Sequence, residues 1–521
     1  MRLINTHTLV LEECFGDQIP KYAILSHTWR NEEVSYQDWQ YNQRESATKK
    51  GFRKIHTACL VAQRHSIEYL WVDTNCINKD SSSELSEAIN SMFTWYERAS
   101  ICFVYLDDFY FEPNGSLAGL EASRWFTRGW TLQELLCPTT VKFFDASWTE
   151  FGTKRSLKVE ISNITSIDIQ YLLDPDSIHR ASVSRRMSWV ATRSTTREED
   201  MAYCLLGIFE INMPLLYGEG GKAFIRLQEE IIKHSNDHTI FCWSWAPSLE
   251  SNETPDWHGC LAPRPIAFRD AKDFVPTEPT SGNSSDFQLT NSGLRITLPL
   301  LDGLLDQFKL GMLDATHPAT PESRLCLCLQ TVGGKSLARS RFPNRLLNIP
   351  RSWPEDMVSV YLAHERDPSR KFSTVVLRGS IGPFLQRHRF AILPVSAADS
   401  QGVALMSIYT MISIPPTQYG AVRSLSQGDE KKLWFTNIKM TSPERPIIEV
   451  NFKARIEKYR GGIWYATIKI QHEKKVITQD IALPPYYEFT LGGDTGPTFV
   501  RPVLISFSKL LAEDGGKTYS V

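Results

Sequence analysis

The sequence lacks the features that mark secreted, membrane-spanning and nucleic-acid-binding proteins. Its 57 basic and 59 acidic side chains leave a net charge of −2, so no basic excess indicates a nucleic-acid partner. The N-terminus has Glu12 and Glu13 where a signal peptide would need an apolar core. The longest uncharged apolar run, residues 402–414, is too short to span a bilayer. We therefore expect a cytoplasmic protein with no membrane span and no nucleic-acid partner.

The cysteine pattern argues against two common kinds of site. The ten cysteines form no C-x-x-C pair, and only Cys326 and Cys328 lie close together. If these two lie on a strand, their side chains point to opposite faces, so neither a zinc site nor a disulfide framework is predicted. We expect reduced thiols, no metal site and no resident cofactor.

Aromatic residues, in contrast, are plentiful, with 14 Trp, 18 Tyr and 26 Phe available to fill sizeable cores. A chain of 521 residues also exceeds a single core, so more than one domain is expected. The predicted organisation is a first domain over 1–150, a helical extension packed on it over 151–236, a strand and irregular linker over 237–285, and a β-sandwich-like antiparallel domain over 286–521.

The first 150 residues alternate short apolar runs with helical spacing. Apolar residues recur at helical intervals from Phe52, and Ser81 with Glu84 predicts a capping box for a further helix. This alternation predicts an α/β fold, with a parallel sheet covered by helices on both faces. The expected strands are residues 22–25, 69–72, 101–106 and 141–144.

The segment 123–138 places a carboxylate among aromatic residues. If it is helical up to Pro138, then Phe126, Trp130 and Glu134 share one stripe of that helix. An ionisable group among aromatics either needs an ion partner or has a role that its environment tunes. Two interpretations of Glu134 follow, a structural glutamate paired with an arginine and a catalytic carboxylate.

Polar residues follow the ends of the predicted strands. Ser26, Asp73, Asn75 and Asp107 each lie just past an apolar run, and ligands of open α/β sheets bind outside the carboxyl ends of the strands. Taken singly, each is more often a turn or helix-cap residue. Their coincidence with Glu134 predicts a ligand site at this edge of the sheet.

These residues resemble a known family. Residues 21–29, 70–78, 84–99 and 128–134 resemble the ordered signature blocks of the fungal heterokaryon incompatibility (HET) domain. Segments 185–191, 195–207 and 214–220 are similar to the region that accompanies this domain in many fungal incompatibility proteins. One departure is Arg30, where the family usually has Gly, which can take positive φ at low cost.

The HET domain in turn resembles, more remotely, the TIR domain of innate immunity, which implies a flavodoxin-like sheet. The segment from Trp130 to Glu134 is similar to a TIR pattern. In that pattern a Trp lies four residues before the glutamate that catalyses NAD cleavage. What this resemblance implies for Glu134 is stabilisation of an oxocarbenium-like transition state as nicotinamide leaves the ribose. It also implies nucleotide contacts by Ser26, His27, Trp29, Asp73, Asn75, Asp107 and Trp130.

Several of these residues have other interpretations. His27 is equally suited to bind a ligand or loop backbone. A Cys76 nucleophile activated by His27 is one alternative, but a free cysteine beside Ile77 is more often a small core residue. Trp29 and Trp71 are more often core residues than ligand platforms.

The rest of the chain gives weaker signals. Thr195 with Glu198 predicts a second capping box, and segment 218–223 lacks the first Gly of a P-loop, so it predicts an entry to a helix. Residues 239–243 predict a strand, followed by an irregular linker or cover. Further strands are expected at 294–301, 325–332, 358–363, 374–377, 390–395, 447–452 and 463–470.

Two function classes follow from these resemblances. One is a cell-death effector of allorecognition, similar to innate-immunity proteins, that cleaves NAD or a related nucleotide. The other is a non-catalytic signalling module that acts by homotypic assembly. Both imply other incompatibility or NLR-like proteins as partners and a homo-oligomer in the active state, and a shared fold does not separate them.

Overall fold

The computed structural model of the chain has two compact units, which are described separately. The first comprises Met1–Ser251 with Leu261–Pro276, and the second comprises Asn252–Cys260 with Thr277–Val521. The residues that the structure describes are 1–16, 19–244, 259–278, 287–302, 308–321, 323–333, 336–339, 346–350, 356–363 and the later strands 390–391, 411–412, 433–436, 450–458, 464–472 and 475–482.

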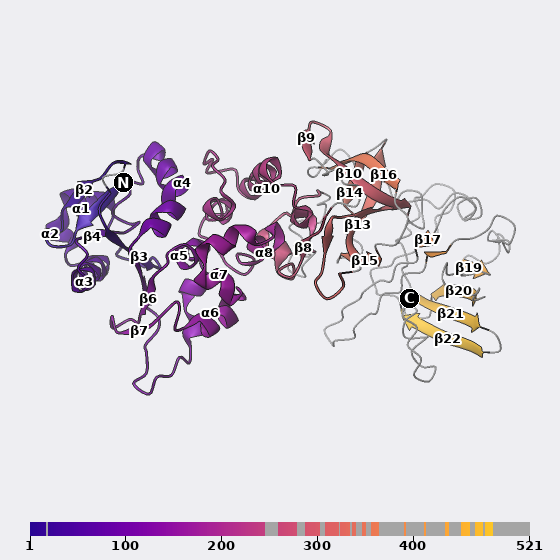
Figure 1. The fold of residues 1–521 in the computed structure, drawn as a ribbon, viewed down its shortest axis with the longest axis horizontal. Coiled ribbons are helices and arrows are strands. Elements are labelled where there is room, and N and C mark those ends of the chain that lie inside the picture. The colour runs from indigo at the N-terminus through magenta and orange to yellow at the C-terminus, as the bar shows by residue number, and fades with distance from the viewer. Residues whose placement is uncertain are drawn as a thin grey trace. The chain divides into compact units, whose positions relative to one another are not determined.

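The first unit is built on a seven-stranded mixed sheet with the order β2-β1-β4-β3-β5-β6-β7 (Figure 1). The four strands predicted from the apolar runs are β3, β4, β5 and β6, and they pair in parallel, as predicted. Antiparallel pairs at both edges were not predicted. The strands are β1 (Arg2–Asn5), β2 (Leu11–Glu13), β3 (Tyr22–His27), β4 (Tyr69–Trp71), β5 (Ile101–Tyr105), β6 (Val141–Phe144) and β7 (Glu150–Thr153).

Helices cover both faces of this sheet (Figure 1). Trp71 of β4 packs edge-on against Tyr96 of α4, with ring centroids 5.9 Å apart. Phe103 of β5 points to the opposite face and contacts His65, the residue that ends α3. The helical segments of this part are α1 (Tyr36–Tyr41), α2 (Gln43–Ser46), α3 (Lys50–Arg64), α4 (Ser82–Arg98), η2 (Leu120–Ala122), η3 (Arg124–Thr127) and α5 (Thr131–Leu136).

The predicted capping box at the start of α4 is only half formed. The Ser81 hydroxyl accepts the Glu84 amide, as predicted. The Glu84 carboxylate, however, does not return to Ser81, because it binds the Arg2 guanidinium and the Asn78 amide instead. The first turn of α4 is therefore tied to β1, the strand next to the edge of the sheet.

The predicted helical extension is helical in the structure. Its segments are α6 (Lys158–Thr165), α7 (Ile169–Leu173), η4 (Pro175–Arg180), α8 (Val183–Ser188), α9 (Asp200–Tyr203), η5 (Gly207–Phe209) and α10 (Lys222–His234). The second capping box was wrong, because α9 begins at Asp200 and the Thr195 hydroxyl donates to the Arg197 carbonyl. The glycine loop does lead into α10, and its Gly218 and Gly220 amides bind the Glu199 carboxylate.

The strand predicted at 239–243 was also wrong. These residues form η6 (His238–Phe241), because the Asp237 side chain accepts the Thr239 amide and caps a helical turn. Further on, the stretch 261–276 packs on the first unit as a cover, with Gln228 binding both the amide and the carbonyl of Ala262. It contains η8 (Pro265–Phe268) and β8 (Val275–Pro276).

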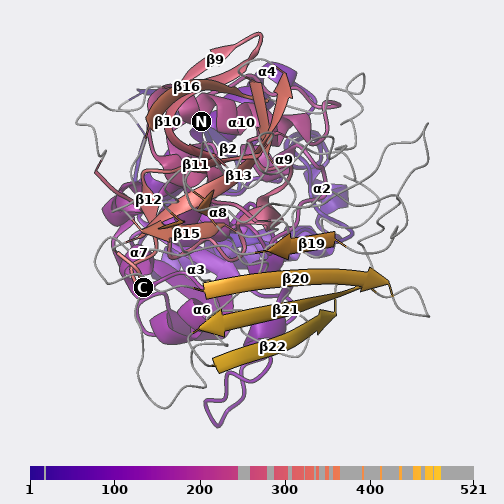
Figure 2. The ribbon, with the colours of Figure 1, turned by 90° about the vertical axis from the view of Figure 1, so that its right-hand side faces the viewer.

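The described part of the second unit consists of strands. One sheet of this unit has hydrogen-bonded neighbours in the order β11-β10-β16-β14-β13. Because β11 also pairs with β13, these strands form a closed ring. Figure 2 shows a separate antiparallel sheet of β19 to β22. The expected strand at 374–377 lies outside the described residues. The strands are β9 (Gln288–Thr290), β10 (Gly293–Asp302), β11 (Phe308–Met312), β12 (Ala315–Thr316), β13 (Ser323–Gly333), β14 (Ser336–Arg339), β15 (Leu347–Pro350), β16 (Asp356–Leu362), β17 (Phe390–Ala391), β18 (Met411–Ile412), β19 (Leu433–Thr436), β20 (Val450–Lys458), β21 (Trp464–His472) and β22 (Lys475–Ala482).

Candidate functional site at the carboxyl ends of the strands

The helix that carries Glu134 is shorter than predicted. The chain forms η3, becomes extended at Arg128 (φ −83°, ψ 139°) and begins α5 only at Thr131. Phe126 lies before this break, so the single stripe predicted for Phe126, Trp130 and Glu134 was wrong. The break forms because Arg128 pairs like a strand with Ser194 of the extension.

Glu134 lies against the end of β3. Its side chain is 7% exposed, and the Ser26 hydroxyl donates to its Oε2 at 2.5 Å. The same hydroxyl oxygen accepts the Trp125 indole N–H at 2.7 Å. Ser26 follows Ile24 by two residues, and Ile24 pairs with Trp71, so Ser26 faces the α4 side of the sheet. The structure thus brings Ser26 and Glu134 into direct contact.

Burial decides the charge of Glu134. Loss of hydration raises the pKa of Glu134 to about 8, while hydrogen bonds from Ser26 and Tyr96 partly oppose this rise. The nearby Asp73 carboxylate raises the pKa further. The carboxyl is therefore uncharged at neutral pH, and no arginine forms an ion pair with it among the described residues.

Trp29 lies at the protein surface beside Asp73. Its side chain is 43% exposed, so the expectation that Trp29 is a core residue was wrong, whereas Trp71 is fully buried, as expected. The Trp29 indole N–H donates to Asp73 at 2.9 Å. The Lys79 ammonium lies 3.5 Å from the centroid of the Trp29 ring. An exposed aromatic face with a cation and a carboxylate beside it is suited to contact a polar ligand.

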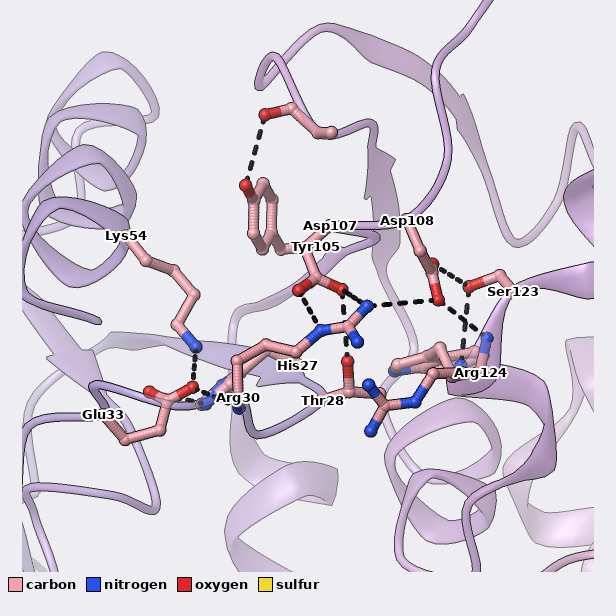
Figure 3. A network of polar contacts seen from close by, with 12 residues as sticks. His27, Thr28, Arg30, Glu33, Lys54, Tyr105, Asp107, Asp108, Ser123 and Arg124 are labelled. Atoms are coloured by element: carbon pink, nitrogen blue, oxygen red, sulfur yellow. Dashed lines mark hydrogen bonds and ion pairs between the residues drawn. The ribbon is translucent and has the colours of Figure 1, made fainter. Parts of the chain in front are cut away.

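Asp107 is engaged by the loop that follows β3. The Arg30 guanidinium binds it through two contacts of 2.5 and 3.0 Å and also lies 3.6 Å from Asp108 (Figure 3). Arg30 does not take positive φ, which in this loop falls on Glu32. Arg30 itself therefore carries no left-handed strain, and its side chain adds an ion pair to the loop.

His27 is buried and uncharged. Burial lowers the pKa of His27 well below its ordinary value, and the neighbouring Lys54 and Lys79 add to this effect. Its Nε2 lies 3.8 Å from Glu33 and 3.9 Å from Asp73. Because the ring is neutral and these distances exceed hydrogen-bond length, neither contact is an ion pair.

Several buried polar groups at this edge have no hydrogen-bond partner among the described residues. Both ring nitrogens of His27, both side-chain polar atoms of Asn75 and the hydroxyl of Thr74 belong to this group. Asn75 is fully buried. Buried polar atoms are normally paired, so these atoms give the site hydrogen-bonding capacity for a ligand.

Two predicted roles are not supported. The Trp130 indole hydrogen-bonds to Asp200 of α9, one of the contacts that lower the pKa of that carboxyl, so it is directed to the extension. Burial raises the pKa of Cys76 to about 12, and a neutral thiol beside a neutral His27 does not form a nucleophilic pair. The interpretation of Cys76 as a core residue is the one that fits.

Three residues around Glu134 were not predicted from the sequence. Trp125 is one residue ahead of the aromatic that the helical spacing indicates, and Tyr96 belongs by its pattern only to the buried stripe of α4. Arg193 lies in the extension, and no local pattern connects it with Glu134.

A pocket of about 290 Å³ lies against α4, away from Glu134. It is lined by Met1, Cys14, Phe15, Gly16, Ile19, Glu87, Ser91, Trp95 and Arg98.

Comparison with known proteins identifies the class of the first domain. Residues 22–110 match the family described as "Heterokaryon incompatibility protein (HET)". This range runs from the start of β3 past the end of β5, and it includes every predicted site residue except Trp130 and Glu134. The resemblance to the HET domain drawn from the sequence is confirmed over these residues.

A particular relative extends this similarity. Vegetative incompatibility protein HET-E-1 from Podospora anserina is 46% identical over 226 residues, which make up 42% of this chain. The chain spans only 16% of the length of that relative. No solved structure matches the chain. In the part of the chain that the structure describes, no helix is long and apolar enough to cross a membrane.

Proposed function

We propose that this chain acts in vegetative incompatibility as a cytoplasmic effector that cleaves NAD at Glu134. The name of the 46% identical relative supports the incompatibility role. The resemblance of the Trp130 to Glu134 segment to TIR domains supports the reaction. The observation that carries the proposal is the contact of Ser26 with Glu134 at the carboxyl ends of parallel strands, where α/β sheets bind ligands.

The proposed reaction breaks the bond between nicotinamide and C1′ of the ribose. Nicotinamide leaves with the bonding electron pair, water adds to C1′, and ADP-ribose and one proton are released. An ionised Glu134 stabilises the positive charge that develops on the ribose. Because the carboxyl is uncharged at neutral pH in the unliganded site, the cationic substrate must favour its ionisation.

Other residues at the mouth of the sheet are assigned to binding. Asn75 and His27 offer unpaired donors and acceptors to the ribose hydroxyls. The partly exposed ring of Trp29 suits contact with a base, and the Lys79 ammonium beside it suits the pyrophosphate. The Lys54 ammonium is already paired with Glu33 at 2.6 Å, so it can bind the pyrophosphate only after leaving that partner. The loop held by Arg30 and Asp107 must move to admit a dinucleotide, because Glu134 is only 7% exposed.

The test is the loss of NAD and the appearance of ADP-ribose, measured by chromatography on the concentrated full chain. Glu134→Gln, which keeps an acceptor for Ser26, should abolish cleavage. Glu97→Gln, at an exposed position on α4, is the matched control and should retain it. Equal cleavage by wild type and Glu134→Gln would remove Glu134 from the mechanism.

The second candidate is a non-catalytic module that acts by homotypic assembly. The burial of Glu134 with internal partners favours it, because a carboxyl held in this way can serve the core alone. In this case no NAD is lost at any concentration, while sedimentation detects the same oligomers for wild type and Glu134→Gln. Other incompatibility proteins are the partners we propose under either function.

A further inference from the structure

Glu134 and Trp125 meet at Ser26 only because the chain between them is broken. In one continuous helix, residues nine apart lie on opposite faces and about 13 Å apart along the axis. In the structure, however, Trp125 and Glu134 both contact the hydroxyl oxygen of Ser26. The extended residue Arg128 and the adjoining Gly129 make this geometry.

The break is held from outside the local sequence. Ser194 donates its amide to the Thr127 carbonyl at 2.7 Å and accepts the Gly129 amide at 2.9 Å. Gly129 is required at this point, because a Cβ there would lie 2.6 Å from the Thr195 methyl group. The helical extension therefore lies directly against the start of α5.

Arg193 is the buried cation of this contact. It is 7% exposed, and its Nη1 donates to the Arg128 carbonyl and to the Thr131 hydroxyl, both at 2.9 Å. Its Nε donates to the Trp189 carbonyl at 3.2 Å, which fixes the fork to the extension. Burial lowers the pKa of Arg193 to about 10.

We propose that Arg193 is a positioning residue for Glu134. It keeps the chain extended ahead of α5, so that this short helix presents the Glu134 carboxyl to Ser26. Without Arg193, only the backbone pairing of Thr127 and Gly129 with Ser194 holds the break. A continuous helix over segment 124–136 then becomes accessible, and in that helix Trp125 and Glu134 separate. The extension is in this way a working part of the site.

The test uses the full chain and takes the protonation of Glu134 as its signal. A buried carboxyl with a raised pKa holds its proton in the folded state, so the unfolding constants of wild type and Glu134→Gln should diverge by about tenfold per pH unit between pH 5 and 8. Urea unfolding followed by helical circular dichroism measures this ratio, because the described helices lie in the first unit. The groups near Glu134 that influence its charge are Ser26, Asp73, Tyr96, Cys102, Arg128 and Arg193.

In the Arg193→Met background, Glu134→Gln should no longer alter the pH dependence, and the divergence should fall below about twofold per pH unit. Arg186→Met is the matched control, because this arginine of α8 is also largely buried but donates to the Ile208 carbonyl and stacks on Phe209. It should reduce stability and keep the tenfold divergence. A tenfold divergence that persists in Arg193→Met would overturn the proposal.

Gly129→Ala provides a second variant if Arg193→Met does not fold. Its Cβ pushes against Thr195 and so disturbs the same contact from the other side, with the same loss of divergence expected. A role for Glu134 in NAD cleavage rests on the proposed function. The pH dependence of unfolding does not require that function, because it reports only the protonation of Glu134. If wild type fails to cleave NAD while the divergence depends on Arg193, the proposed function fails and the positioning role stands. If NAD is cleaved and both variants keep the divergence, the proposed function stands and the positioning role fails.

Discussion

Replacing Glu134 with glutamine is expected to change how the stability of the first unit depends on pH. In wild type, burial raises the pKa of Glu134 from 4.5 to about 8. Unfolding returns the carboxyl to water, where it ionises near its ordinary value. Between pH 4.5 and 8 the folded state therefore holds one proton more than the unfolded state, so stability falls as pH rises. The stabilisation linked to this proton is complete below pH 4.5 and is lost as the pH approaches 8.

The magnitude follows from one proton. Linkage gives at most about 1.4 kcal/mol per pH unit and less near either pKa, so the free energy of unfolding should fall by about 3.5 kcal/mol between pH 5 and 8. This is a large part of the ~5–15 kcal/mol that stabilises a typical domain. Glutamine still accepts the Ser26 hydroxyl but cannot ionise, so Glu134→Gln should lack this fall.

Urea unfolding of both proteins at half-unit pH steps measures the difference. Every other titrating group is common to both, so the difference in unfolding free energy isolates position 134. The Glu97→Gln control should run parallel to wild type, because that glutamate is exposed. Parallel curves for wild type and Glu134→Gln would refute the reasoning, because the carboxyl would then have to be solvated or ion-paired in the folded state.

Two further predictions concern the supports of the site. Lys154 is 3% exposed, and its ammonium donates to the carbonyls of Leu135, Leu136 and Pro138 at the end of α5. Lys154→Met should cost about 3 kcal/mol in chemical unfolding, as expected for buried hydrogen bonds to a charged group, whereas the exposed Arg155→Met should change stability by less than about 0.5 kcal/mol. Arg30 is 39% exposed in its side chain, so Arg30→Gly should cost no more than about 1 kcal/mol in the same assay. A loss above about 2 kcal/mol would show that these ion pairs hold the loop more strongly than exposed pairs normally do.

The sequence predicted those parts of the fold that depend on local apolar pattern. The four central strands each have an uninterrupted apolar run, and all four were found. The edge strand β2 (Leu11–Glu13) was missed because two of its three residues are glutamates, so it has no apolar run. The strand prediction for the apolar run 239–243 was wrong because a buried helical turn has the same composition, and Asp237 decides between them.

The position of the site could be predicted, but its internal contacts could not. Strand ends place Ser26, Asp73, Asn75 and Asp107 at one edge whatever the surrounding side chains do. The helix break before Glu134 is different, because Arg193 and Ser194 impose it from more than sixty residues further along the chain. A local pattern contains no information about such a contact.

The same distinction separates the residues that are available to a ligand from those that are already occupied. The sequence predicts the same ligand-binding role for Asp107 and Asn75, since both follow a strand of the parallel sheet. In the structure Arg30 occupies the Asp107 carboxylate, whereas both polar atoms of Asn75 have no partner among the described residues. In the sequence, Arg30 was notable because Gly, which can take positive φ, is usual at its position. In the structure, its effect on the site comes from the side chain, which binds Asp107. A ligand that enters this edge therefore finds Asn75 without a partner once the cover over this buried residue moves, but it can use Asp107 only after displacing the guanidinium.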